Sequence, residues 1–350
     1  MDTLKRAGTL LVISFLMVAL LDTGGHDAKE GSGQKDRPLV GIAMCSLLTE
    51  RWYKDLEALT AELGRLGADV IVQNANNQQN LQNQQIENLI EKGIDVLVVI
   101  PVSSTACRRA VAKAKDAGVR VIAYERVVLQ TDIDLYISFD NINLGRQMGQ
   151  GLLRHMQGVN VLLINGDRED KNSEVYKEGY MEVLQPAVDT GSIQIIGEVW
   201  AENWTKEVAY DAVESQLARG VGIHGIIAEN DSLAEMAIQA LSERGAVNET
   251  VVVGQDGDLG AYQRIVLGVQ TATVYKDYEV LAHKAALAAY RLANDRPIST
   301  NGTINNGYGD IPCYYLDTTL ITKNNIQREI IEAKVYSEEE ICRNIQRIYD

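Results

Sequence analysis

Residues 94–124 read IDVLVVIPVSSTACRRAVAKAKDAGVRVIAY, and their pattern indicates the fold class more clearly than any other part of the chain. Two β-branched runs, Val96–Ile100 and Val119–Tyr124, flank a stretch of helical periodicity over Ala106–Ala117. Gly118 follows that stretch, where a residue in the left-handed conformation ends a helix without the steric penalty of a Cβ atom. A strand, a helix and a strand in this order predict parallel strands that are buried on both faces.

The same alternation continues outward in both directions. Further strands are predicted at Leu39–Met44, Asp69–Gln73, Tyr136–Phe139, Val159–Asn165, Ile193–Val199, Ile223–Ala228 and Val251–Gln255. Further helices are predicted near Trp52–Leu66, Asn80–Lys92, Ser173–Leu184, Thr205–Ala218 and Ser232–Arg244. A chain of 350 residues exceeds the roughly 250–300 at which one hydrophobic core stops growing. We therefore predict an α/β protein with two doubly wound, Rossmann-like lobes.

Composition excludes several classes of function. The formal charge of −15 disfavours nucleic acids and anionic lipids, because both need a cationic surface. No GxxxxGK[ST] loop and no GxGxxG turn follows a predicted strand, which argues against nucleotides and phosphorylated ligands. The cysteines and histidines are too dispersed for a metal site, a redox motif or a Ser-His-Asp set, so we expect no metal, no cofactor and no catalysis. These residues are Cys45, Cys107, Cys313, Cys342, His26, His155, His224 and His283.

Residues 1–35 are interpreted as a targeting segment. Lys5 and Arg6 precede an uncharged run, Ala7–Leu21, which is shorter than the ~20 residues of an ordinary membrane span. This favours a signal peptide and an extracytoplasmic location. No A-x-A-like cleavage site and no lipid-bearing cysteine follows the run, however, so an uncleaved membrane anchor formed by residues 7–21 is an open alternative.

Polar and aromatic side chains gather just after the predicted strands. In open α/β sheets, ligands bind beyond the carboxyl ends of the strands. The segments at this edge include Cys45–Trp52, Asn74–Asn77, Glu125-Arg126 and Trp200–Trp204, and they contain all three tryptophans. Charged planar groups bind two hydroxyls at once, and indole rings cover the C–H faces of a sugar ring. This edge therefore predicts a site for an unphosphorylated monosaccharide.

The same segments carry a family resemblance that extends from about Leu39 to Ile331. The matching segments are Glu50-Arg51-Trp52 with Lys54-Asp55, Val72–Asn76, Gln85–Asn88, Asp95–Pro101, Asp132–Asn141, Asn230-Asp231, Gly254–Asp256, Thr273–Lys276 and Lys323–Ile326. In these segments the chain resembles the periplasmic D-xylose-binding proteins of bacterial ABC importers. The resemblance implies the type I periplasmic-binding-protein fold, with D-xylose or a closely related monosaccharide as ligand.

The resemblance also implies which residues contact the sugar. They are Arg51, Arg126, Asp170, Asn172, Asn230, Asp256 and Lys276 as polar contacts, Trp52 and Trp204 as stacking faces, and Glu125 as a further contact. Glu125 departs from the family pattern, which has Asp at this position, and its extra methylene puts the preference among close pentoses and hexoses in doubt. Asn165–Arg168 also departs, and adds charge at the rim of the pocket.

The fold of the family implies three hinge strands, expected near Phe139–Asn141, Thr273–Lys276 and Asn305–Gly309. The predicted N-terminal lobe then comprises residues 36–140 and 276–305, and the C-terminal lobe residues 141–275 and 306–332. Residues 333–350 are left as a tail, with Ser337–Tyr349 expected to be a solvated element.

Two functions with the same ligand stay open at this point. One is a receptor that closes on the sugar and presents it to the permease of an ABC importer. The other is a membrane-anchored sensor that reports the sugar to a membrane histidine kinase, which the missing lipid-bearing cysteine favours. A cytoplasmic repressor would need a DNA-binding headpiece where residues 1–35 have an apolar run, and an enzyme lacks catalytic groups.

Overall fold

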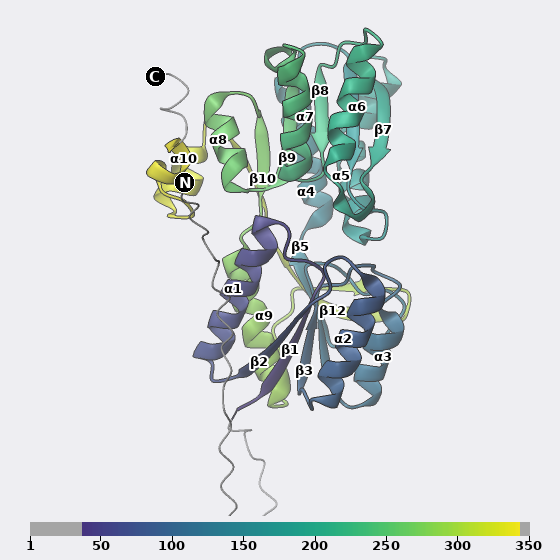
Figure 1. Cartoon of the computed structure of the whole chain (residues 1–350), viewed down its shortest axis with the longest axis vertical. Coiled ribbons are helices and arrows are strands. Elements are labelled where there is room, and N and C mark those ends of the chain that lie inside the picture. The colour runs from purple at the N-terminus through teal and green to yellow at the C-terminus, as the bar shows by residue number, and fades with distance from the viewer. Residues whose placement is uncertain (1–36, 344–350) are drawn as a thin grey trace, which may run out of the picture. The chain divides into compact units, whose positions relative to one another are not determined.

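The structure, a computed structural model, describes residues 37–343 and contains two β-sheets (Figure 1). The first sheet has the strand order β11-β12-β5-β4-β3-β1-β2. Its strands are β1 (Leu39–Met44), β2 (Asp69–Asn74), β3 (Val96–Val99), β4 (Arg120–Tyr124), β5 (Leu135–Phe139), β11 (Gly302–Asn305) and β12 (Asp310–Leu316). All neighbouring strands are parallel except the β11–β12 hairpin.

Helices cover both faces of the first sheet. These helices are α1 (Glu50–Arg65), α2 (Gln79–Glu91), α3 (Arg108–Asp116) and α9 (Tyr278–Ala293). Leu59 and Leu63 of α1 and Leu281 of α9 are buried on one face, whereas Ile86 of α2 and Val111 of α3 are buried on the other. Burial on two faces explains why the strands read as continuous apolar runs. The glycines that follow α1, α2 and α3 have φ between 73° and 86°, and the C-cap predicted at Gly118 is one of them.

The second sheet has the order β13-β10-β9-β8-β6-β7, and only the β10–β13 pair is antiparallel. Its strands are β6 (Asn160–Asn165), β7 (Gln194–Trp200), β8 (Gly225–Ala228), β9 (Val251–Asp256), β10 (Ala272–Tyr275) and β13 (Thr319–Thr322). The elements around it are α4 (Asn141–His155), α5 (Lys171–Asp189), η1 (Glu202–Trp204), α6 (Glu207–Ala218), α7 (Asp231–Glu243), η2 (Val247–Glu249), α8 (Leu259–Leu267), η3 (Gln327–Glu332) and α10 (Glu338–Cys342). The α/β class with two doubly wound lobes is confirmed.

The chain passes between the two sheets three times in the described range. It leaves the first sheet after β5, at Asp140, and returns after β10, at Lys276 and Asp277. The last passage, Asp317-Thr318, joins β12 of the first sheet to β13 of the second.

The prediction of the third hinge near Asn305–Gly309 is wrong. That segment forms the turn of the β11–β12 hairpin, and β12 pairs with β5 in the first sheet. Buried Asn306 fixes the turn, because its Nδ2 donates to Val128 O at 3.0 Å and to Thr131 O at 2.8 Å. Residues 306–316 therefore lie with the first sheet and not, as predicted, in the C-terminal lobe.

The expected solvated C-terminal element is exposed at Ser337, Glu338, Glu339 and Arg343, but it is also anchored to the second lobe. Ser337 and Glu340 form a capping box at the start of α10. Tyr336 and Ile341 are buried in an apolar cluster with Tyr262 of α8. Residues 344–350, and the predicted signal or anchor segment 1–35, lie outside the described residues.

Two further features concern the whole described range. Between residues 37 and 343, no helix has the length and hydropathy that crossing a bilayer demands. The four cysteines are free, and Cys45, Cys107 and Cys313 are buried. Burial raises the pKa of the Cys45 thiol to about 11 despite nearby Arg126.

Candidate functional site

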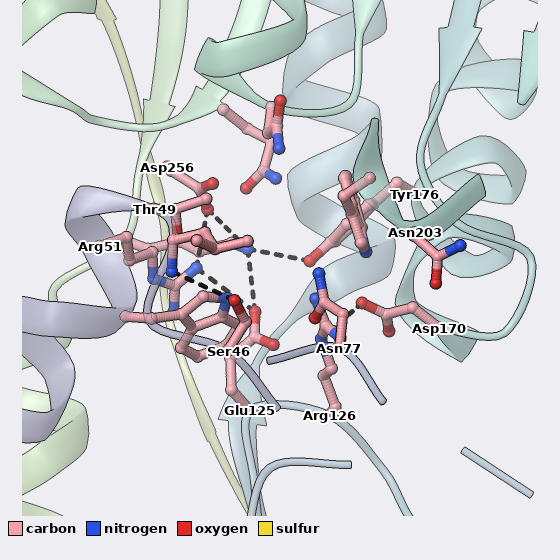
Figure 2. Close-up of a pocket in the computed structure, with 16 residues that line it drawn as sticks. Ser46, Thr49, Arg51, Asn77, Glu125, Arg126, Asp170, Tyr176, Asn203 and Asp256 are labelled. Carbon is pink, nitrogen blue, oxygen red and sulfur yellow. Dashed lines mark hydrogen bonds and ion pairs between the residues drawn. The ribbon is translucent and has the colours of Figure 1, made fainter. Parts of the chain in front are cut away.

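A cavity of about 110 Å³ opens at the carboxyl ends of strands from both sheets (Figure 2). It is lined by Ser46, Leu48, Thr49, Arg51, Trp52, Asn77, Glu125, Arg126, Asp170, Tyr176, Asn203, Trp204, Asn230, Gln255, Asp256 and Lys276. Nine of the ten residues predicted from the sequence belong to this set; Asn172 does not.

Ion pairs between the two lobes converge on one side of the cavity (Figure 2). Arg51, in the first turn of α1, lies 2.7 Å from Asp256 at the end of β9. Lys276 lies 3.2 Å from the same Asp256 oxygen and 3.1 Å from Glu125, which follows β4. Lys276 also donates to the Tyr176 hydroxyl at 2.9 Å. Two cations and two carboxylates thus form one network between the two sheets.

Opposing effects set the protonation of Glu125. Burial raises its pKa, but the charges of Lys276, Arg51 and Arg126 outweigh burial and lower the pKa to about 2. Glu125 is therefore a carboxylate at neutral pH. Asp55, which Arg51 Nε contacts at 3.1 Å, behaves differently: burial raises its pKa to about 6 although Arg51 opposes this.

The backbone of Glu125 is held by donors from both lobes. Its φ of 63° lies in the left-handed region that a non-glycine residue rarely adopts. The carbonyl oxygen accepts from Ser138 Oγ at 2.7 Å, from the Tyr136 hydroxyl at 3.1 Å and from Asn172 Nδ2 at 3.1 Å. Asn172 Nδ2 also lies 3.2 Å from Glu125 Oε2, so the structure places Asn172 behind Glu125 and outside the cavity lining.

Arg126 forms the other side of the cavity with Asp170, as Figure 2 shows. Arg126 Nε lies 2.7 Å from Asp170 Oδ2, an ion pair whose geometry falls short of a hydrogen bond. Burial raises the pKa of Asp170 to about 6, against the effect of Arg126. The guanidinium carbon of Arg126 lies 5.3 Å from the ring centre of Trp52 and 5.8 Å from that of Trp204. One cation thus neighbours both indoles that line the cavity.

The Trp204 indole packs on Gly166, just after β6. A Cβ atom on Gly166 would lie 2.5 Å from Trp204 Cζ3 and closer still to Cη2. Glycine at this position therefore lets the ring lie against the backbone. Trp200 lies outside the cavity lining, where its Nε1 donates to Glu198 at 2.9 Å and Arg168 stacks on it at 4.1 Å.

Strained backbone is concentrated at the cavity. Of the nine non-glycine residues with positive φ between residues 37 and 343, five line it. They are Asn77, Glu125, Asn203, Trp204 and Asp256. Such conformations persist only where surrounding contacts impose them, and they gather at functional sites. This supports the cavity as the functional site.

Sequence reasoning did not single out seven lining residues. Five of them, Ser46, Leu48, Thr49, Asn77 and Asn203, lie inside the strand-end segments that were selected, but they carry no resemblance of their own. Gln255 belongs to β9 itself. Tyr176 lies one helical turn after Asn172 on α5, and this i, i+4 spacing is the signal that could have found it.

The site suits recognition of hydroxyl groups. Its side chains include both donors and acceptors, with two aromatic faces. Within residues 37–343, no group of His, Cys, Asp and Glu is arranged to hold a metal ion.

Comparison with known proteins places the chain among ligand receptors. Residues 40–297 match the family described as periplasmic binding protein domain. The chain is 39% identical over 303 residues to the D-xylose-binding periplasmic protein of Escherichia coli K12, covering 86% of this chain and 92% of that protein. It is 37% identical over 303 residues to the Haemophilus influenzae protein of the same name, covering 86% and 91%.

A solved structure supports the same placement. The carbohydrate transporter solute-binding protein from Chloroflexus aurantiacus, in complex with D-glucose, superposes with a TM-score of 0.82. It is 30% identical, and the match covers 87% of this chain and 98% of that one.

Proposed function

The chain belongs to the periplasmic binding protein family, whose members bind ligands without transforming them, and on this premise we propose that it is an extracytoplasmic receptor for D-xylose. The observation that carries the proposal is the cavity between the two sheets, with an indole from each lobe and charged groups that both donate and accept. The two relatives named for D-xylose are more similar to the chain than the glucose-bound structure is, which favours the pentose.

We propose that the nine predicted residues of the cavity lining contact the sugar. Trp52 and Trp204 cover its C–H faces, and Arg126 and Asp256 hold its hydroxyls through charge-assisted hydrogen bonds. Glu125 is ionised and accepts hydrogen bonds only. Asn172 supports the site from behind, through its hydrogen bonds to Glu125.

Binding becomes a change of shape because the sugar's contacts come from both lobes. A ligand shifts an equilibrium only by its differential affinity for the two forms. The ion pair between Arg51 and Asp256 and the bond of Asn172 to Glu125 form between the lobes, so lobe separation would break them together with the sugar contacts. The closed receptor then offers a permease of an ABC importer a surface that the open form lacks.

The alternative partner, a membrane histidine kinase, depends on a tether within residues 1–35. Those residues lie outside the described range, and no contact within residues 37–343 bears on the tether. It stays a prediction that N-terminal sequencing of the exported protein tests directly.

Calorimetric titration against D-xylose, D-ribose, L-arabinose and D-glucose tests the proposal. We expect saturable one-to-one binding with D-xylose as the strongest ligand, and no conversion of the sugar. Trp204→Ala is the binding-deficient comparison, and Trp200→Ala, outside the cavity, is its matched control. A stronger response to D-ribose would overturn the choice of ligand, and no response to any monosaccharide would overturn the function.

A further inference from the structure

Asp256 has the most unusual backbone among the residues that line the cavity. Its φ is 110°, beyond the left-handed helical region, and it precedes Gly257 with φ of 80°. Its carboxylate nevertheless lies 2.7 Å from Arg51 and 3.2 Å from Lys276. Some contact must hold the turn after β9 in this conformation, because the strain alone favours relaxation.

Asp231 supplies that contact. It is the first residue of α7, is almost fully buried and does not line the cavity. Its Oδ2 accepts from Gly257 N at 2.9 Å, from Asp258 N at 3.1 Å and from Thr273 Oγ1 at 2.8 Å. Its Oδ1 accepts from Gln270 Nε2 at 2.8 Å. The two residues that follow Asp256 are thus bonded to one carboxylate.

Close packing on β9 makes this arrangement specific for aspartate. The Asp231 carboxylate packs directly against the backbone of Gly254. A Cβ atom on Gly254 would overlap Asp231 Oδ1 and lie 3.0 Å from Gln270 Nε2, so position 254 has no room for any side chain. The Gln270 amide cannot turn over, because its Oε1 accepts from Arg264 Nε at 2.8 Å and its Nε2 also donates to Ala272 O at 3.2 Å. Both oxygens of Asp231 accept from donors. In an asparagine at position 231 one oxygen is replaced by an NH₂ group, and in either orientation this NH₂ group would face a donor.

We propose that Asp231 is a positioning residue for sugar binding: it imposes the strained turn that aims Asp256 at Arg51 and at the sugar. The inference rests on the proposed function and deepens it. It assigns a role to a buried carboxylate that touches no ligand. Asp231 affects sugar affinity only by positioning Asp256. A residue that merely stabilised the lobe would affect affinity whether or not Asp256 is present.

A double-mutant cycle on the full chain tests the inference. D-Xylose affinity is measured by calorimetry for the wild type, Asp231→Asn, Asp256→Ala and the double variant. We expect Asp231→Asn to weaken binding about tenfold or more, and to change affinity less than about twofold in the Asp256→Ala background. Equal losses in the two backgrounds, or unchanged affinity in folded Asp231→Asn, would overturn the proposal.

A milder variant covers the case in which Asp231→Asn does not fold. Thr273→Val removes one of the four donors and is expected to weaken binding about fivefold, again only when Asp256 is present. Thr250→Val is the matched control. Thr250, which directly precedes β9, is also buried, and its Oγ1 also donates at 2.8 Å, in this case to Ile223 O. Equal affinity losses in the Thr273 and Thr250 variants would contradict the proposal.

A measurement without sugar separates this inference from the proposed function. Amide hydrogen exchange of the sugar-free protein reports the turn directly. We expect Thr273→Val and Asp231→Asn to speed exchange at Gly257 and Asp258 at least about tenfold more than at the amides of α2. If no monosaccharide binds but exchange accelerates as expected, the proposed function fails and the positioning of the turn stands. Unchanged exchange at the two amides overturns the inference whether or not sugar binds.

Discussion

Replacing Gly166 by alanine tests whether the Trp204 indole is a platform for the sugar. The new Cβ atom would lie 2.5 Å from Trp204 Cζ3 and from Ser173 Oγ, and nearer to Trp204 Cη2. Ordinary carbon contacts need about 3.5–4.0 Å, so the ring must retreat by about 1 Å or more. Ser173 is fully buried, whereas Trp204 is only half-buried and lines the cavity, so we expect the ring to take up most of the shift.

The size of the effect follows from where the clash is relieved. Overpacking costs about 1–3 kcal/mol when the neighbours cannot move. In the sugar-free protein the indole relieves much of this cost by moving outward. The bound sugar needs the ring in place, so the cost reappears as lost affinity. At 1.4 kcal/mol for each factor of ten, we expect D-xylose to bind about 5- to 150-fold more weakly.

Calorimetric titration of Gly166→Ala and Gly64→Ala measures this loss against a matched control. Gly64 lies inside α1, and a Cβ atom there would meet nothing within 4 Å beyond the backbone of its own helix. Alanine at this position should therefore add about 1 kcal/mol of stability and leave the affinity unchanged. Thermal unfolding of both variants separates binding from folding. Wild-type affinity in folded Gly166→Ala would refute the platform.

Three further changes test other parts of the site. Trp204→Ala should weaken D-xylose binding at least about tenfold in a calorimetric titration and Trp200→Ala less than about twofold, since only Trp204 lines the cavity; equal losses would contradict this. Because the pKa of Glu125 is lowered to about 2, its ionised form stabilises the fold above pH ~4.5 and that stability is lost as pH falls toward 2. Urea unfolding should therefore show a stability gap between wild type and Glu125→Gln that is constant above pH ~5, about 3 kcal/mol at most, and smaller in acid; a gap independent of pH would refute the charge network. Tyr336→Phe removes a hydroxyl that bonds Lys54 of α1 and should weaken binding about two- to fivefold by destabilising the closed form, whereas an unchanged titration would rule the contact out as a contributor.

Local patterns predicted most of the fold because the strands are buried on both faces. The run Leu39–Met44 is confirmed as β1 residue for residue, and the glycines after α1, α2 and α3 mark the ends of those helices. The third passage between sheets had no such signal. Its true position, Asp317-Thr318, depends on the pairing of β12 with β5, residues far apart in the sequence. The burial of Ile341 likewise depends on contacts with α8 that periodicity in a short charged segment does not reveal.

Those residues of the site that directly follow a predicted strand could be identified from the sequence. Arg51, Glu125 and Asp256 all fall at such positions and come together in the cavity. Asn172 does not fit this pattern. It lies beside the cavity residues, but its amide donates to the carbonyl oxygen of Glu125, whose backbone is left-handed, and neither feature can be read from the sequence.

A crystal structure of the protein grown with D-xylose tests the central claim most directly. One sugar ring should lie between Trp52 of the first lobe and Trp204 of the second, with hydroxyls within hydrogen-bond distance of Arg126 and Asp256. A sugar that contacts one lobe alone, or that binds outside this cavity, would contradict the account.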